Sequence, residues 1–323
     1  MKYRPLEFFK SYLESIKELE KLNLKSFSDE QVWEEYYKYI KKETGILDLP
    51  SEFESELYFS FLRSYVLEGW RRNKQVYTFS EEFYNMLCTM EDIQPEAEMF
   101  ECLPYNSFYI ELAVKNKYDG IFVKFDKISN KLFFILVFKK EGSSIFVINF
   151  EEKLTIKQLC EVITRVEYKE LDKISKKSKN TISYAHSQNE LLEILTFAIQ
   201  ATMYLCAKNS HIEENKAQKK IYKVSQNSIK DRYAEVRKWD VGYRLSAEER
   251  VCVQDFKMEN SNTETELSCK RRNRPRQHWR RAHWHTYWVG KGRTEKALRF
   301  IPPTLVNNIE DDLPVVNHLV KKN

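Results

Sequence analysis

Four short segments between residues 107 and 150 constrain the fold more than any other feature of this sequence. They are rich in β-branched and aromatic residues and are separated by turn-like stretches at 117–120 and 141–144, which is the pattern of β-strands. The third segment, LFFILVFK, is apolar on both faces, so it should lie inside a sheet that helices cover on at least one side. We predict an antiparallel meander with strands at 107–114, 121–126, 132–139 and 145–150.

The first hundred residues have helical periodicity instead. Apolar residues recur every three or four positions from the start of the chain and predict a first helix. Ser28 and Gln31 form a capping-box signature that should begin a second helix. A third helix is predicted at about 52–72, and Ser80 should cap a fourth. The apolar repeat consists of Leu6, Phe9, Leu13, Ile16 and Leu19.

Two more helices are predicted at about 155–167, capped by Thr155, and at 188–207, where Ser187 and Glu190 form a capping box. The second is apolar almost all round but too short and too polar to span a bilayer, so we expect it to be the central core helix. The polar stretches 172–181 and 208–230 should be mobile. VGYRL (241–245) and VCVQDF (251–256) read as short strands.

These elements predict an α+β protein in which a helical N-terminal layer packs on a mostly antiparallel β-meander, followed by a strand-rich basic C-terminal segment. Residues 1–323 are expected to form a single α+β domain, with a possible subdivision into a helical region (1–100), a sheet with its core helices (101–256) and the basic aromatic segment (270–308).

Glycine and cysteine usage limits the chemistry. The seven glycines form no phosphate-binding motif, so no nucleotide or other cofactor is expected. The six cysteines contain no C-x-x-C pair, and neither a signal peptide nor a long apolar run is recognisable, so we expect a reduced, cytoplasmic protein that does not enter a membrane.

Positive charge is concentrated near the end of the chain. Residues 270–299 contain eleven Lys or Arg and one acid, which gives +10, so the other residues together carry −5 of the overall +5. Such a block is typical of a surface for nucleic acid, an acidic protein or a membrane.

Within this block, the sequence RRAHWHTYW (280–288) allows several interpretations. On a β-strand, Arg281, His283, His285 and Tyr287 would face one way, and Ala282, Trp284, Thr286 and Trp288 the other. The tryptophans could simply anchor the strand in the core.

A metal site is a weaker interpretation because no acid or cysteine lies at ligand spacing and flanking arginines would repel a cation. We expect no metal. The alternative function is a metal-dependent single-strand nicking or RNA-cleaving nuclease using His283 and His285, which would need a distant nucleophile such as Tyr204. No catalytic residue is assigned, and we expect a binding protein rather than an enzyme.

The nucleic-acid interpretation requires neither metal ligands nor a nucleophile. Arginines can neutralise phosphates, and the aromatic side chains can stack on unpaired bases. The candidate nucleic-acid-binding residues are Arg271, Arg272, Arg274, Arg276, Trp279, Arg280, Arg281, His283, His285 and Tyr287.

The C-terminal sequence KRRNRPRQHWRRAHWHTYWVGKG, followed by LRFIPPTLVNN, resembles the signature of the second anti-CRISPR family directed against type V-A systems. RSYVLEGWRRNKQVYTFSEEF (63–83), LPYNSFYIEL (103–112) and VGYRL are similar to it in the same order. The resemblance implies a phage or plasmid protein that suppresses synthesis of the CRISPR effector nuclease and promotes loss of its transcript. The implied partners are the effector mRNA, the nascent effector chain or the ribosome, and a host ribonuclease is a further candidate. The implied location is the cytoplasm of a bacterial host cell.

Overall fold

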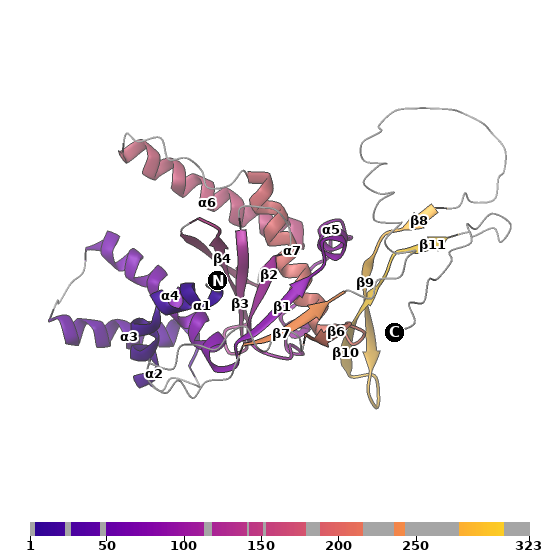
Figure 1. Ribbon diagram of the computed structural model, residues 1–323, viewed down its shortest axis with the longest axis horizontal. Coiled ribbons are helices and arrows are strands. Elements are labelled where there is room, and N and C mark those ends of the chain that lie inside the picture. Colours follow the sequence, from indigo (N-terminus) through magenta and orange to yellow (C-terminus); the bar gives the residue numbers. More distant parts are fainter. Residues whose placement is uncertain are drawn as a thin grey trace.

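The computed structural model describes residues 4–22, 27–45, 50–112, 118–140, 142–150, 153–178, 188–215, 236–242 and 278–306. Its centre is a seven-stranded sheet with helices on both faces, and the C-terminal strands extend from one end (Figure 1). The predicted α+β class and the mixture of N-terminal helices with a mostly antiparallel sheet are confirmed. The strand order is β5-β4-β3-β2-β1-β7-β6.

The predicted meander forms one side of this sheet. Its four strands pair antiparallel in sequence order, within a few residues of the predicted bounds. They are β2 (Ser107–Leu112), β3 (Tyr118–Asp126), β4 (Lys131–Phe138) and β5 (Ser143–Asn149).

The other side of the sheet was not predicted. β1 (Gln75–Phe79) pairs parallel with β2 and with β7 (Arg237–Val241), and β6 (Ile212–Glu214) pairs antiparallel with β7 at the edge. β1 is easily missed because its five residues follow a long helix directly and are mostly buried on both faces, so they show no polar alternation.

Two sequence predictions need correction in this region. Residues 172–178 continue a helix and 212–214 form β6, although both lie in stretches that were expected to be mobile. Of VGYRL, residues 243–245 lie outside the described residues, and Val241 is the last residue of β7. Gly242 ends it with a φ of 72°, and a Cβ there would come within 2.5 Å of the Phe83 ring. The predicted strand at 251–256 lies outside the described residues.

Helices cover both faces of the sheet. On β4, Leu132, Phe134 and Leu136 contribute to one apolar core, whereas Phe133 and Ile135 contribute to the other, so the expected burial of this strand is confirmed on both faces. The core that contains Phe133 is covered by α1 (Arg4–Ser11), α2 (Leu13–Lys21), α3 (Asp29–Thr44) and α4 (Ser51–Asn73). The core that contains Phe134 is covered by α5 (Glu81–Cys88), the short 3₁₀ turn η1 (Ala97–Phe100), α6 (Ile156–Ser178) and α7 (Gln188–Cys206).

Most predicted helix caps are present. Ser28 and Gln31 form the reciprocal capping box of α3, and Ser80 accepts a hydrogen bond from the Phe83 amide at 3.2 Å. Thr155 likewise accepts from the Gln158 amide at 3.3 Å. Ser187 lies outside the described residues. These caps satisfy amide groups that the first turn of a helix leaves without partners.

α7 is the central core helix, as predicted. Its side chains from Phe197 to Cys206 are all buried. Among the described helices, none is long and apolar enough to cross a membrane. Of the cysteines that the structure describes, Cys160 and Cys206 are buried, Cys88 is partly buried and Cys102 is exposed; burial raises the pKa of the Cys160 thiol to about 12.

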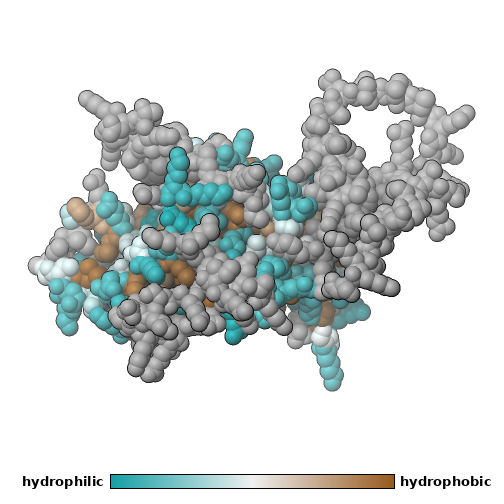
Figure 2. Space-filling view, viewed as in Figure 1, coloured by the Kyte–Doolittle hydropathy of each residue, from teal (hydrophilic) through white to brown (hydrophobic). Residues whose placement is uncertain are grey.

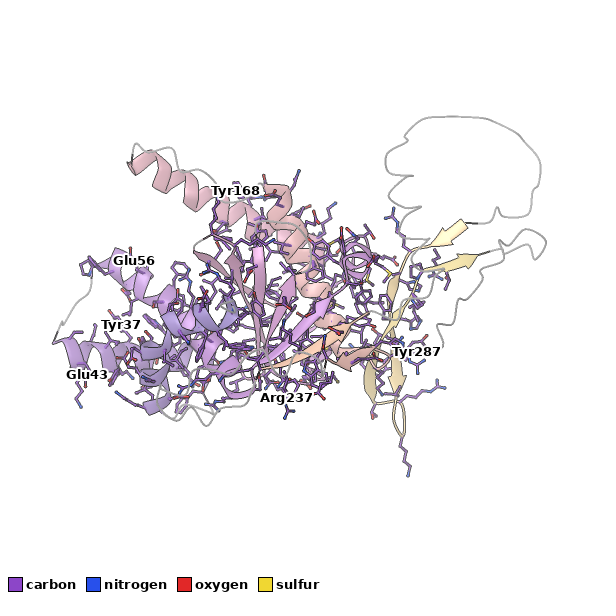
Figure 3. The ribbon with its side chains drawn as sticks, in the orientation of Figure 1. Tyr37, Glu43, Glu56, Tyr168, Arg237 and Tyr287 are labelled. Carbon is purple, nitrogen blue, oxygen red and sulfur yellow. The ribbon has the colours of Figure 1, made fainter. Side chains whose placement is uncertain are left out.

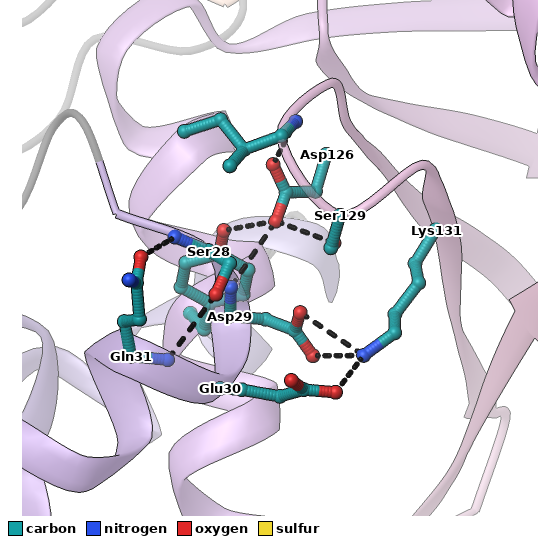
Figure 4. Close-up of polar contacts among 9 residues, drawn as sticks. Ser28, Asp29, Glu30, Gln31, Asp126, Ser129 and Lys131 are labelled. Atoms are coloured by element: carbon teal, nitrogen blue, oxygen red, sulfur yellow. Dashed lines mark hydrogen bonds and ion pairs between the residues drawn. The ribbon is translucent and has the colours of Figure 1, made fainter.

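A buried carboxylate joins α3 and α4 to the sheet (Figure 4). Asp126, at the end of β3, accepts hydrogen bonds from the Asp29 amide (3.2 Å), the Tyr65 hydroxyl (3.2 Å), the Ile128 amide (2.9 Å) and the Ser129 hydroxyl (2.7 Å). It is only 6% exposed. Because one side chain satisfies four donors from three elements of the structure, it fixes how the helical layer meets the meander.

We expect Asp126→Ala to lower the free energy of unfolding by about 3 kcal/mol, because it leaves several buried donors without an acceptor. Ser129→Ala, which removes only one of those donors, should cost about 1 kcal/mol. Urea denaturation of the two variants measures both values. Equal stabilities would contradict a structural role for the Asp126 carboxylate.

Candidate nucleic-acid interface on the C-terminal hairpin

The motif RRAHWHTYW leads into a β-hairpin. β9 (His283–Val289) pairs antiparallel with β10 (Glu295–Ile301), and Trp284 lies opposite Phe300 in the register. The turn contains three positive φ angles, at Gly290, Gly292 and Arg293. Two short flanking strands, β8 (His278–Arg280) and β11 (Thr304–Val306), pair with each other beyond the end of the hairpin that is opposite its turn (Figure 1).

One face of the hairpin packs against the core. Trp284 is 8% exposed, its ring lies 5.6 Å from that of Phe300, and its indole N–H donates to the Gln200 side-chain oxygen of α7 at 2.5 Å. Asn209 holds the neighbouring strand through both backbone groups of Phe300, at 2.7 and 3.0 Å. The base of the hairpin is therefore fixed in position by specific polar contacts as well as by apolar burial.

The predicted alternation of faces is only partly correct. Ala282 and Trp284 are buried as expected, but Trp288 is 56% exposed and His283 only 9% exposed. Trp288 lies four residues beyond Trp284, or about 13 Å along a strand, so it projects past the helix that covers Trp284. His283 lies at the base of the hairpin, where its Nδ1 is 3.2 Å from the carbonyl oxygen of Arg281.

The outward face carries a short aromatic stack. The rings of His285 and Tyr287 lie 4.1 Å apart at an angle of 28°, and the Arg299 guanidinium is 5.4 Å from the Tyr287 ring centre. Tyr287 is 38% exposed and projects from the side of the hairpin (Figure 3). This row presents an exposed planar ring with a cation on one side, which suits stacking of a base beside a phosphate.

The opposite face of the tip carries a second cation and aromatic pair. The Lys296 ammonium lies 5.7 Å from the Trp288 ring centre and 2.5 Å from a carboxylate oxygen of Glu96, which raises the pKa of Lys296 through a hydrogen bond and its negative charge. Thr286, Tyr287, Trp288 and Arg293 line an open hollow at the tip.

The structure brings together only part of the predicted site. Arg280, Arg281, His285 and Tyr287 are exposed at the hairpin or just before it, whereas His283 is buried. The backbone of Trp279 lies in β8, but its side chain lies outside the described residues. Arg271, Arg272, Arg274 and Arg276 also lie outside the described residues.

The sequence prediction missed four residues of this surface: Trp288, Arg293, Lys296 and Arg299. A signal for them was present, because HWHTYWV and EKALRFI are two apolar alternating segments separated by GKGRT, which is typical of a β-hairpin. Recognising that hairpin would have placed Arg299 beside His285 and Tyr287.

The nuclease alternative finds little support in the geometry. In the part of the chain that the structure describes, no group of three or more His, Cys, Asp or Glu side chains could hold a metal ion. Tyr204 is 2% exposed and packs between Phe83 and Phe300, so its hydroxyl cannot reach a phosphate.

The two tryptophans should respond differently to truncation. We expect Trp284→Ala to lower the free energy of unfolding by about 3–5 kcal/mol through a core cavity and a lost hydrogen bond. Trp288→Ala should change it by less than about 0.5 kcal/mol, because this side chain is largely in solvent. Thermal unfolding of both variants compares them, and a large loss from Trp288→Ala would show that the tip is packed against other residues.

Comparison with solved structures identifies a protein of similar fold. The structure is similar to a crystal structure of AcrVA2, with a TM-score of 0.53 over 95% of this chain and all of the other, at 14% sequence identity. At this identity the similarity establishes the fold. No curated protein sequence matches the chain significantly.

A family model gives the assignment that sequence identity alone does not. Residues 77–308, which run from β1 through the C-terminal hairpin, match the AcrVA2-like model, described as the anti-CRISPR type V subtype A2 family. The match covers well over half of the sequence and includes every strand of the sheet except the first two residues of β1. The chain therefore belongs to the AcrVA2-like family of type V subtype A2 anti-CRISPR proteins.

Proposed function

We propose that this protein is an anti-CRISPR factor that suppresses synthesis of a type V-A effector nuclease by recognising its nascent chain or its mRNA and promoting loss of the transcript. Family membership supports the anti-CRISPR part of the proposal. The exposed stack of His285, Tyr287 and Arg299 supports the mechanism, because it provides a rigid surface where RNA can be contacted without a catalytic centre.

The hairpin is the RNA-facing or ribosome-facing element in this proposal. Its base is held by Trp284 and Asn209, so the exposed rings at the tip are positioned before binding and lose little conformational entropy on contact. Arg299, whose guanidinium lies 5.4 Å from the Tyr287 ring centre, and the exposed Arg280 would supply charge for phosphates. Degradation of the transcript is assigned to a host ribonuclease.

Single-stranded RNA binding should depend on the exposed stack. We expect Tyr287→Ser to weaken binding of a labelled unstructured RNA about tenfold, since a stacked base loses its aromatic partner. Arg280→Gln and Arg299→Gln should each also reduce the steepness of the salt dependence, by about 0.7 on a log–log plot. Fluorescence anisotropy at several salt concentrations measures both effects.

The matched control for these variants is Val162→Ser, at an exposed apolar position on α6, far along the sequence from the hairpin. It should bind RNA like the parent protein. If Tyr287→Ser binds RNA as tightly as this control, the aromatic stack is not an RNA surface. Cleavage of the RNA that a chelator stops would instead favour the nuclease alternative.

In cells, the hairpin should be required for transcript loss. Expression beside a type V-A effector gene should lower effector mRNA and effector protein together, and a variant combining His285→Ala, Tyr287→Ser and Arg299→Gln should leave both at the level found without the inhibitor. Quantitative reverse transcription and immunoblotting measure the two quantities. Loss of effector protein at constant mRNA, or full activity of the triple variant, would contradict the proposed mechanism.

A further inference from the structure

A second unusual surface lies at the other end of the molecule, in residues 27–60, which we call the acidic arm. These residues include nine Asp or Glu, three Lys and eight aromatic residues. α3 and the first half of α4 belong to it, and they diverge from each other as they extend away from the sheet, opposite the C-terminal hairpin (Figure 1).

Aromatic contacts lead from the core out to the surface of the arm. Phe61 is fully buried, and its ring lies 5.2 Å from that of Trp33. Trp33 in turn lies 5.0 Å from Tyr58 and 5.3 Å from Tyr37, and all three of these outer rings are partly exposed. The arm is thus an extension of the core that retains solvent-facing aromatic rings.

The apolar stripe of α4 continues beyond the core as well. Phe53, Leu57 and Phe61 are spaced by four residues and share one side of the helix. Their exposure rises along this stripe, from a buried Phe61 through a partly buried Leu57 to Phe53, which is 62% exposed. Figure 2 shows such apolar residues among hydrophilic ones over this end of the molecule. A phenylalanine this exposed at the end of an apolar stripe indicates a contact surface.

The charges around these rings are predominantly negative. Glu34 on α3 and Glu54 and Glu56 on α4 are exposed, and Figure 3 locates Tyr37 and Glu56 on the two diverging helices. One cation within the arm already uses an aromatic face, because the Lys41 ammonium lies 4.6 Å from the Tyr37 ring centre. Rings surrounded by carboxylates attract Lys and Arg side chains through both the ring quadrupole and the negative potential.

We propose that the acidic arm binds a basic polypeptide segment of a partner protein, one that presents Lys or Arg together with apolar side chains. The carboxylates would pair with the cations of the segment, and Phe53, Trp33 and Tyr58 would contact its apolar residues. A nucleic acid is disfavoured because its phosphates would face a net negative surface. The inference goes beyond the function proposed for the hairpin, whose charge is opposite.

The probe for this proposal is a fluorescently labelled amphipathic peptide of lysine and leucine, with a glutamate and leucine peptide of the same pattern as its counterpart. The full-length protein should bind the basic peptide, more weakly as salt rises, and should not bind the acidic one. Phe53→Ser, and separately Glu54→Gln with Glu56→Gln, should each weaken binding about tenfold, because they remove the apolar and the charged contribution.

Matched control variants carry the same changes elsewhere. Val166→Ser removes an exposed apolar side chain from α6, and Glu98→Gln with Glu101→Gln removes two exposed charges, one within η1 and one at its end. Both variants should bind the peptide like the parent protein. Tyr287→Ser should also retain peptide binding, so failure of the hairpin proposal and failure of this one are distinguishable. Unfolding curves should show that all of these surface variants remain folded.

Three outcomes would overturn the proposal. The first is equal affinity for the acidic and the basic peptide. The second is unchanged affinity in both acidic-arm variants. The third is concentration-dependent self-association of the parent protein that Phe53→Ser abolishes, since a second copy of the chain would then be the occupant of the arm.

Discussion

The rest of the structure depends on the burial of α7. A helix that is apolar almost all round has to be enclosed, and here the sheet, α5, α6 and the C-terminal hairpin together enclose most of it. Its one buried amide side chain, Gln200, accepts the Trp284 indole N–H, so the polar group that burial would penalise instead fixes the base of the hairpin. Core stability and the position of the candidate site therefore rest on the same helix.

Local signals predicted much of this fold. The four meander strands, the caps at Ser28, Ser80 and Thr155, and the core position of α7 follow from periodicity and capping chemistry, which are properties of adjacent residues. β1, β6 and β7 were not predicted. β1 is mostly buried on both faces and shows no alternation, its parallel pairing with β7 joins segments more than 150 residues apart, and β6 has only three residues.

The candidate site shows where alternation stops being informative. A period of two assigns side chains to faces, but burial also depends on how far the covering element extends. Trp284 and Trp288 share a face of β9, yet only Trp284 has α7 beneath it, so one tryptophan anchors the hairpin and the other is available at its tip. Similarly, Arg299 lies near the Tyr287 ring because β10 pairs with β9, and Arg299 is not part of the sequence RRAHWHTYW.

The distribution of charge separates the two proposed binding surfaces along the longest direction of the molecule. The basic hairpin belongs to the segment that matches the family model, whereas the acidic arm precedes residue 77 and lies outside that match. Both surfaces are built in a similar way, with exposed rings that lie beyond buried ones on the same side of an element: Trp288 beyond Trp284 on β9, and Phe53 beyond Phe61 on α4. Because the ends carry opposite charge, a single ligand cannot satisfy both. The two proposals together therefore describe a protein that holds a basic polypeptide at one end and an anionic partner at the other.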